Sequence, residues 1–376
     1  MFDNIRLHTE QSIFQKLQHL GWGLVLLIIT FACIGFIALY SAAGGNLDPW
    51  ASKQILRFII GMGGMFFIAL IDIKFWFRMA YPIYIVGFVM LIVVELMGHI
   101  GMGAQRWINL RFIQIQPSEF MKIAVVMALA KYFHSASRED MRSIRFLIPG
   151  LFLIMAPVVL VLLQPDLGTS LMIVMAGIAM FFVAGAPIWM FIVGGVLVVA
   201  AMPLSWMFMH DYQKRRVMTF LDPESDPLGA GYHITQSKIA LGSGGIEGKG
   251  FLQGTQSHLN FLPEKQTDFI FTLWAEEWGF LGGAFILLMA GLIFAYGIFI
   301  ALKCRHSFGR LLSIGLVINF SLYVFINIGM VMGLLPVVGA PLPLVSYGGT
   351  SMLAILVGFG LMLSCNVHRD SKLMRA

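Results

Sequence analysis

The sequence predicts an all-α polytopic membrane protein with about ten transmembrane helices, and three observations lead to that fold class. Of 376 residues, 59% are hydrophobic and only 12% are charged, whereas a soluble domain is about 45–50% apolar and about 25% charged. The mean hydropathy is +0.84. Apolar runs of about 18 or more residues recur along the chain, and each can cross the roughly 30 Å hydrocarbon core of a bilayer.

Ten apolar runs predict the spans. Their approximate ranges are 19–43, 54–72, 79–98, 118–136, 146–164, 167–185, 187–208, 268–302, 311–335 and 346–366. The first run exceeds the roughly 7–15 residues of a signal-peptide core, so we expect a retained anchor. Only Gly185-Ala186-Pro187 separates the sixth span from the seventh. Loss of that break would invert every later span.

The positions of Lys and Arg predict that both termini are cytoplasmic. In this orientation the inner segments hold 14 of the 25 basic residues, in agreement with the positive-inside rule. The short outer loops hold four, which are Lys53, Arg57, Arg106 and Arg111. The predicted organisation is one membrane domain over residues 1–376, with a cytoplasmic N-terminal segment (1–18), a large extracytoplasmic loop between spans seven and eight (209–267) and a cytoplasmic tail (367–376).

Charge and cysteine usage exclude two classes of function. The net charge of +6 is concentrated in short loops between apolar runs, so it reflects membrane topology and not nucleic-acid binding. Cys33, Cys304 and Cys365 are isolated and show no CxxC spacing. They predict neither disulfides nor a zinc site.

Polar motifs gather at the outer ends of the predicted spans. They are Gln105-Arg106-Trp107, Gln116-Pro117-Ser118-Glu119, Gln164-Pro165-Asp166, Thr267-Asp268 and the segment from Pro343 to Gly349. Helix capping can explain any one of them, since Ser118, Asp166 and Thr267 are good N-cap residues. Every helix needs caps at both ends, however, and the inner loops offer only basic residues and turns. The one-sided distribution therefore favours a functional site on the outer face.

Charged residues inside spans point to the same face. Lys122 lies about one turn inside span four, three residues after Glu119, where an unpaired ammonium costs on the order of 2.5–3.5 kcal/mol. It either snorkels to the interface or lines a polar cavity that opens outward. Glu276 and Glu277 lie two turns into span eight and point to different sides. At most one of them is expected to face Asp268, and their role stays open.

The glycine-rich stretch LGSGGIEGKG, residues 241–250, is only superficially similar to a phosphate-binding loop. A P-loop needs Gly at the position of Ser243 and Ser or Thr at the position of Gly250. We expect these glycines to form turns, with backbone amides that can also contact a pyrophosphate.

Four long stretches together resemble the SEDS family (shape, elongation, division and sporulation), and the last of them is more similar to its rod-shape branch than to its division branch. They are QPSEFMK at 116–122, DPESDPLGAGYHITQSKIALGSGG at 222–245, GKGFLQGTQSHLNFLPEKQTDFIF at 248–271 and LLPVVGAPLPLVSYGGTS at 334–351. The resemblance covers nearly all of the membrane portion.

The resemblance implies a peptidoglycan glycosyltransferase of the bacterial cytoplasmic (inner) membrane that polymerises lipid II into a nascent glycan strand during elongation. It implies an essential acid at Asp268 and functional positions at Arg106, Glu119 and Lys122. It also implies a class B penicillin-binding protein as transpeptidase partner within the elongation machinery. A divalent cation, Mg²⁺ or Mn²⁺, is expected to assist, with its ligands unassigned, and no organic cofactor is expected.

Such a reaction needs only a few catalytic side chains. A sugar on a lipid pyrophosphate already carries a good leaving group that needs charge neutralisation, while the acceptor hydroxyl needs a base. We therefore expect Asp268 to act as general base, with Arg106 and Lys122 neutralising the pyrophosphate.

Two other classes of function stay open. A lipid II flippase would suit the breaks near Pro157, Pro203 and Pro336, and a non-catalytic cell-wall scaffold would use the outer loop only for docking.

Overall fold

The computed structural model describes residues 12–97, 99–101, 104–109, 114–209, 211–222, 229–259, 261–262 and 264–373. Arg111, most of the predicted N-terminal segment, part of the large outer loop and the last three residues of the tail lie outside the described residues.

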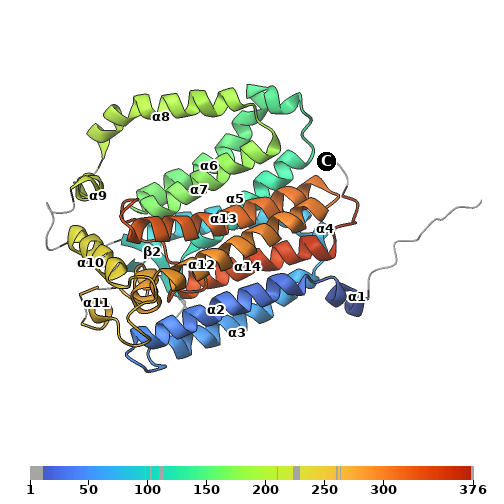
Figure 1. Ribbon diagram of the computed structural model, residues 1–376. Coiled ribbons are helices and arrows are strands. Elements are labelled where there is room, and N and C mark those ends of the chain that lie inside the picture. The colour runs from blue at the N-terminus through green and yellow to red at the C-terminus, as the bar shows by residue number, and fades with distance from the viewer. Residues whose placement is uncertain are drawn as a thin grey trace, which may run out of the picture.

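Long helices form at all ten predicted spans (Figure 1). They are α2 (Trp22–Ala42), α3 (Ala51–Leu70), α4 (Ile73–Met97), α5 (Pro117–His134), α6 (Ile144–Leu163), α7 (Leu167–Ala184), α8 (Ile188–Phe208), α12 (Ile270–Lys303), α13 (Ser307–Val331) and α14 (Gly349–Val367). Within the described chain, eight of these are long and apolar enough to cross a membrane, and Ile188–Leu204 is a further apolar helix. The predicted polytopic all-α architecture is confirmed.

Short elements fill the loops. The helices are α1 (Ile13–Gln18), a 3₁₀ turn η1 (Asp140–Arg142), α9 (Asp211–Leu221), α10 (Ala230–Ser243) and α11 (Thr255–His258). A small antiparallel sheet with the order β1-β2-β3 joins α4 to α5 and was not predicted; its strands are β1 (His99–Gly101), β2 (Ala104–Asn109) and β3 (Gln114–Ile115). Strand β2 carries Arg106, so the sheet sets the position of one predicted site residue.

Helix α5 is the most deeply enclosed of the predicted spans that carry charge. Fifteen of its 18 residues are buried, and it packs against α4, α7 and α13. It contains Glu119, Lys122 and Lys131, which keeps its hydropathy below that of the eight apolar helices. A helix that is surrounded by protein can hold such charges because its neighbours, and not lipid, must satisfy them.

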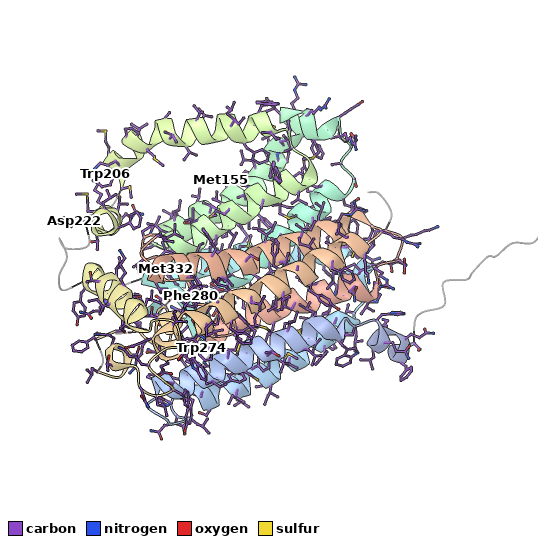
Figure 2. The ribbon with its side chains drawn as sticks, viewed as in Figure 1. Met155, Trp206, Asp222, Trp274, Phe280 and Met332 are labelled. Atoms are coloured by element: carbon purple, nitrogen blue, oxygen red, sulfur yellow. The ribbon has the colours of Figure 1, made fainter. Side chains whose placement is uncertain are left out.

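Helix α8 has the opposite environment. Most of its described side chains are exposed, including Val196, Leu197, Val198 and Val199, and Figure 1 shows it at the edge of the bundle, well apart from α13. An apolar helix with this much exposed surface is suited to contact with lipid. Its far end is marked by Trp206 in Figure 2, at the same end of the molecule as Asp222 and Trp274.

Contacts between distant loops gather the predicted inner segments at one end of the bundle. The Asn366 side chain donates to the His19 carbonyl (Nδ2 to O, 2.8 Å), and the Phe308 amide donates to His134 Nδ1 (3.1 Å). The first contact joins the start of α2 to the end of α14, and the second joins the end of α5 to the start of α13. The polar junctions consequently lie at the opposite end, which the basic-residue distribution predicts to be the outer one.

Helix α12 is kinked at Gly279, whose φ of 64° and ψ of −161° are not helical. The kink frees backbone groups within an apolar helix, and such groups need hydrogen-bond partners from the protein because lipid cannot supply them. The glycine-rich segment 244–250 satisfies them instead. The bonds run from Lys249 N to Glu276 O (3.1 Å), Gly250 N to Glu277 O (3.0 Å), Phe280 N to Gly245 O (2.9 Å) and Leu281 N to Ile246 O (3.2 Å). The expectation that these backbone amides contact a pyrophosphate is therefore wrong for Lys249 and Gly250, because both amides already donate to carbonyls of α12.

Replacing Gly279 with alanine is expected to destabilise the fold by about 3 kcal/mol or more, because the residue would hold a strained positive φ and its Cβ would collide with the backbone of Ile246 and Gly248. Thermal unfolding in detergent measures the effect. Gly291→Ala is the matched control, since it lies in the same helix and its Cβ would meet nothing within 4 Å. Equal unfolding midpoints for the two variants would contradict this account of the kink.

Candidate functional site

Asp268 lies in the turn that leads into α12 and is fixed by bonds to its backbone. Asn327 of α13 donates from Nδ2 to the Asp268 carbonyl at 2.9 Å and to the Ala340 carbonyl at 2.7 Å. The Ser346 hydroxyl donates to the neighbouring Thr267 carbonyl at 2.6 Å. The residue is therefore clamped between α13 and the segment from Ala340 to Ser346, and its side chain is only partly buried.

Gly339 leaves room for the Asp268 carboxylate. It has a φ of 73°, and a Cβ added there would lie 3.6 Å from Asp268 Oδ2. The preceding residue, Val338, packs its carbonyl against Gly168 at the start of α7, where an added Cβ would lie only 2.6 Å away. The segment 338–339 thus connects Asp268 to the first turn of α7, just after Asp166.

Lys122 forms a buried cluster with Glu119 and Tyr323. Its ammonium lies 2.8 Å from Glu119 Oε1 and donates to the Tyr323 hydroxyl, which in turn donates to Glu119 Oε2. The Lys122 side chain is 1% exposed, and its Nζ lies 4.1 Å from the centre of the Tyr323 ring. Snorkelling is therefore wrong for Lys122: the ammonium is satisfied inside the protein by one carboxylate and one phenol.

One face of α13 connects this cluster to Asp268. Tyr323 and Asn327 are four residues apart, so they lie on the same side of the helix, separated by about 6 Å along its axis. Tyr323 bonds to Glu119 and Asn327 bonds to the Asp268 backbone. The Glu119–Lys122 pair consequently lies about one helical turn below the turn that holds Asp268.

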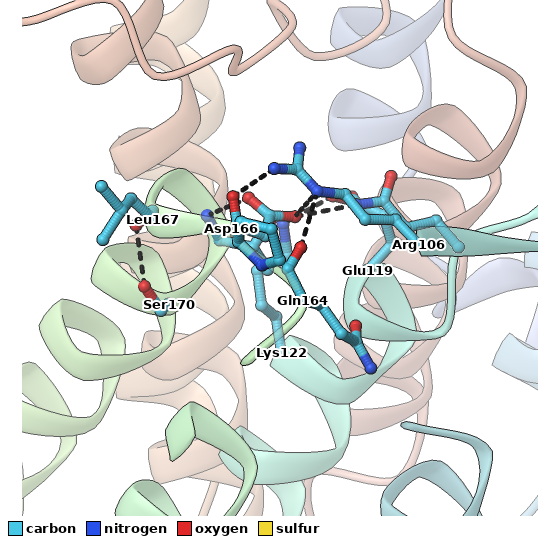
Figure 3. Close-up of polar contacts among 10 residues, drawn as sticks. Arg106, Glu119, Lys122, Gln164, Asp166, Leu167 and Ser170 are labelled. Atoms are coloured by element: carbon cyan, nitrogen blue, oxygen red, sulfur yellow. Dashed lines mark hydrogen bonds and ion pairs between the residues drawn. The ribbon is translucent and has the colours of Figure 1, made fainter. Parts of the chain in front are cut away.

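Arg106 reaches from β2 to the start of α7 (Figure 3). Its Nε donates to the Gln164 carbonyl at 3.1 Å, another guanidinium nitrogen donates to the Pro165 carbonyl, and Nε lies 4.0 Å from Asp166 Oδ2. The side chain keeps 26% of its surface exposed, whereas Asp166 keeps 6%. Arg106 can therefore offer a positive charge to a ligand at the outer surface.

Asp166 ties this arginine to α5. It accepts from the Thr169 amide (3.1 Å) and hydroxyl (2.9 Å), and from Gln116 Nε2 (3.1 Å). Gln116 is the N-cap residue of α5, the helix that carries Glu119 and Lys122. The four predicted site residues are thus brought together at the outer end by α5, α7 and α13.

Capping explains only one of the three candidate N-caps. Asp166 caps α7 through its bond from the Thr169 amide. Ser118 lies inside the first turn of α5, and Thr267 precedes the N-cap of α12 by two residues. For Ser118 and Thr267 the capping interpretation is wrong.

Glu276 and Glu277 point to separate partners, as their adjacency required. Glu276 is fully buried and pairs with Lys249 at 2.8 Å; it also accepts from the Ser257 hydroxyl at 2.8 Å and the Gln256 amide at 2.9 Å. It therefore anchors α11 onto α12. Glu277 accepts a hydrogen bond from Ser41 of α2. The contacts of Glu276 hold the outer loop against α12, and the bond of Glu277 joins α12 to α2.

The structure adds residues that sequence reasoning missed. Tyr323 and Asn327 are polar groups within the last third of an apolar helix, where their side chains need hydrogen-bond partners. Arg57 lies in the second turn of α3, and its guanidinium carbon lies 5.0 Å from the centre of the Tyr347 ring. The Tyr347 amide donates to the Gln266 carbonyl (2.8 Å), so Arg57 adds a positive charge beside the segment that clamps Asp268.

Lys265 contributes a further cation near the same turn. Its ammonium donates to the Ser257 carbonyl at 2.9 Å, and burial lowers the pKa of Lys265. For a metal ion, the parts of the chain that the structure describes contain no group of three or more His, Cys, Asp or Glu side chains placed to hold one.

The chain matches known proteins over almost its whole length. A family model described as "Cell cycle protein", named for FtsW, RodA and SpoVE, matches residues 19–371. Among curated proteins, the chain is 43% identical over 363 residues to the peptidoglycan glycosyltransferase MrdB of Escherichia coli K12, covering 96% of this chain and 97% of that protein. It is 36% identical over 359 residues to the stage V sporulation protein E of Bacillus subtilis, covering 93% and 97%.

Two solved structures are also similar to this chain over almost its whole length. One comes from a study of how a peptidoglycan synthase complex coordinates polymerization and crosslinking; its matching chain is 32% identical with a TM-score of 0.81, covering 93% of this chain and 98% of that chain. Another is the crystal structure of the rod shape determining protein RodA of Thermus thermophilus, 29% identical with a TM-score of 0.70 and the same coverage.

Proposed function

The chain belongs to the FtsW, RodA and SpoVE family, the SEDS family, and we propose that it polymerises lipid II at the outer end of its helical bundle. It is a multi-pass protein of the bacterial inner membrane and a peptidoglycan glycosyltransferase of the elongation type, as its similarity to MrdB and RodA indicates. The proposal concerns the substrate, the residues that carry the reaction and the partner.

A single observation carries the proposal. Asp268, the partly exposed guanidinium of Arg106 and the buried Glu119–Lys122 pair are linked through α5, α7 and α13 at the end of the bundle where the polar junctions gather. A lipid-linked sugar that faces the outer solution presents its pyrophosphate at the membrane surface. The cluster combines a partly exposed carboxylate with a partly exposed cation at that level.

In the proposed reaction, the Asp268 carboxylate accepts the proton of the GlcNAc 4-hydroxyl as that oxygen attacks the anomeric carbon of the donor MurNAc. The new C–O bond forms with inversion, giving a β-1,4 link, while the bond from the anomeric carbon to phosphate breaks. The lipid pyrophosphate leaves with the electron pair of that bond. One base is sufficient because the leaving group needs no proton.

The two cations have different roles in this proposal. Arg106 is partly exposed and contacts the pyrophosphate, where a guanidinium can form two hydrogen bonds to phosphate oxygens. Lys122 is neutralised by Glu119 and shielded from the outer solution, so it acts as a positioning residue that fixes Tyr323 and, through α13, the turn of Asp268. This revises the direct phosphate contact that the sequence suggested for Lys122.

The divalent cation expected from the resemblance stays a prediction. Mg²⁺ is commonly held by one or two carboxylates together with substrate phosphates, an arrangement that requires no compact cluster of side chains. No step of the reaction proposed here depends on it.

The proposed partner is a class B penicillin-binding protein that supplies crosslinking. The similar chain from a peptidoglycan synthase complex that couples polymerization with crosslinking supports a partner of this kind. The α9–α11 region is the largest structured part of the outer loop, and we propose it as the segment that a partner can rearrange.

Lipid II polymerisation by the purified protein in detergent tests the function. We expect glycan strands to form, and to form faster when the cognate penicillin-binding protein is present. The flippase alternative predicts no product, because detergent removes the two compartments between which a lipid moves. The scaffold alternative also predicts no product, because this chain would then form no glycosidic bond and the partner supplies only crosslinking. Absence of polymer from folded protein with its partner would reject the proposal.

A further inference from the structure

A cavity lined in part by basic side chains lies at the opposite end of the bundle, the end predicted to be cytoplasmic. It has a volume of about 250 Å³ and opens between the loop after α5 and the end of α7. Its lining includes Ser137, Arg138, Met141, Arg142, Ala184 and Gly185. The end of α5 lies beside the start of α13, which fixes this cavity at the end away from Asp268.

The two arginines of this cavity are available for a ligand. Arg138 and Arg142 are exposed, and within the described chain neither forms an ion pair with a carboxylate. The carboxylate of the nearby Asp140 accepts hydrogen bonds from the Ser137 amide (2.9 Å) and hydroxyl (2.7 Å). With Arg145, the loop 135–145 has three basic and two acidic side chains, which leaves a net charge of +1 (3 − 2).

Exposed apolar side chains lie close in sequence to the cavity lining. Ile144 begins α6 two residues after Arg142, and Ile188 and Trp189 begin α8 just after Gly185; all three are exposed. Tryptophan at a helix end is typical of the membrane interface. The arginines of the cavity are thus followed in the chain by exposed apolar residues at the starts of α6 and α8.

We propose that this cavity binds the phosphate headgroup of an anionic phospholipid of the inner leaflet, such as phosphatidylglycerol or cardiolipin. Basic pockets between transmembrane helices on the cytoplasmic side suit such headgroups, and guanidinium groups bind phosphate through two parallel hydrogen bonds. A free phosphate would use only the arginines. The exposed Ile144, Ile188 and Trp189 favour a ligand with acyl chains, and this site is separate from the proposed polymerisation site.

Native mass spectrometry of the full-length protein in detergent tests the proposal. Phosphatidylglycerol and phosphatidylcholine with identical acyl chains are titrated in parallel. We expect a preference of about tenfold or more for phosphatidylglycerol, given two arginines near the surface. In the Arg138→Gln/Arg142→Gln variant the preference is expected to fall below about threefold, whereas Arg138→Lys/Arg142→Lys is expected to keep most of it.

Arg305→Gln is the matched control, because Arg305 is also at the cytoplasmic end but pairs with Asp370 at 3.0 Å. It is expected to keep the full preference, and unfolding midpoints confirm that each variant is folded. Equal affinity of the unaltered protein for the two lipids would overturn the proposal. An equal loss in the Arg305 variant would do the same, as would displacement of the lipid by an equal concentration of glycerol 3-phosphate.

Discussion

Replacing Asp268 with asparagine is expected to lower the rate of lipid II polymerisation by about 10²- to 10⁴-fold, the usual contribution of a positioned general base. Asparagine has the same shape but cannot accept the proton of the acceptor hydroxyl. The bond from Asn327 goes to the Asp268 carbonyl, so the substitution leaves the backbone clamp intact. The rate is measured with purified protein and its penicillin-binding partner in detergent.

Glu264→Gln provides the matched control for this prediction. Glu264 lies in the same turn, is exposed, and accepts a hydrogen bond from the Thr267 hydroxyl at 2.9 Å, which a glutamine can also accept. Its variant is expected to polymerise at the unaltered rate. A folded Asp268→Asn protein with undiminished polymerisation would remove Asp268 from the role of base.

Replacing Lys122 with methionine is expected to destabilise the protein by about 3–5 kcal/mol, because it leaves the buried Glu119 carboxylate without its cation. Polymerisation is expected to fall as well, since Tyr323 loses one of its partners and the face of α13 that holds Asp268 is no longer fixed. Thermal unfolding and polymerisation rate are measured on the same preparation.

The double variant Glu119→Gln/Lys122→Met separates the two effects. It removes both buried charges, so it is expected to recover much of the stability while polymerisation stays low. If the double variant recovered stability and rate together, the pair would be structural only. If Lys122→Met matched the unaltered protein in both measurements, the cluster would contribute nothing measurable.

The number and order of the spans could be predicted because each is encoded locally, by a run of apolar residues of bilayer length. The exact residues at which the helices begin and end could not be predicted in the same way. Helix α4 begins at Ile73, six residues before the predicted start, and thereby includes Lys74 and Arg78. Long basic side chains can extend from a helix into the interface, so charge did not mark the end of this helix.

The candidate site could be predicted only in part. The outer location of Arg106, Lys122 and Asp268 followed from topology, and their roles were suggested by family resemblance. These residues are linked through Tyr323 and Asn327 of α13. Tyr323 lies more than 200 residues after its partner Lys122, and Asn327 lies about 60 residues after its partner Asp268. No local pattern reveals which polar residue of an apolar helix will face which partner.

The glycine-rich segment illustrates a second limit. The turns predicted from its glycines are present. Their backbone groups form hydrogen bonds with α12 around Gly279, about 30 residues away, where the kink leaves backbone groups without helical partners. A single glycine in an apolar run gives no indication that the helix will break there. The bonds between the two segments become evident only in three dimensions.

Binding and polymerisation measured side by side on the Asp268→Asn protein test the central claim most directly. The account predicts that lipid II binds within about threefold of the unaltered affinity while the rate of glycan formation falls at least about 100-fold, as expected for loss of proton transfer alone. Polymerisation at the unaltered rate, or a loss of rate fully explained by weaker lipid II binding, would contradict Asp268 as the base.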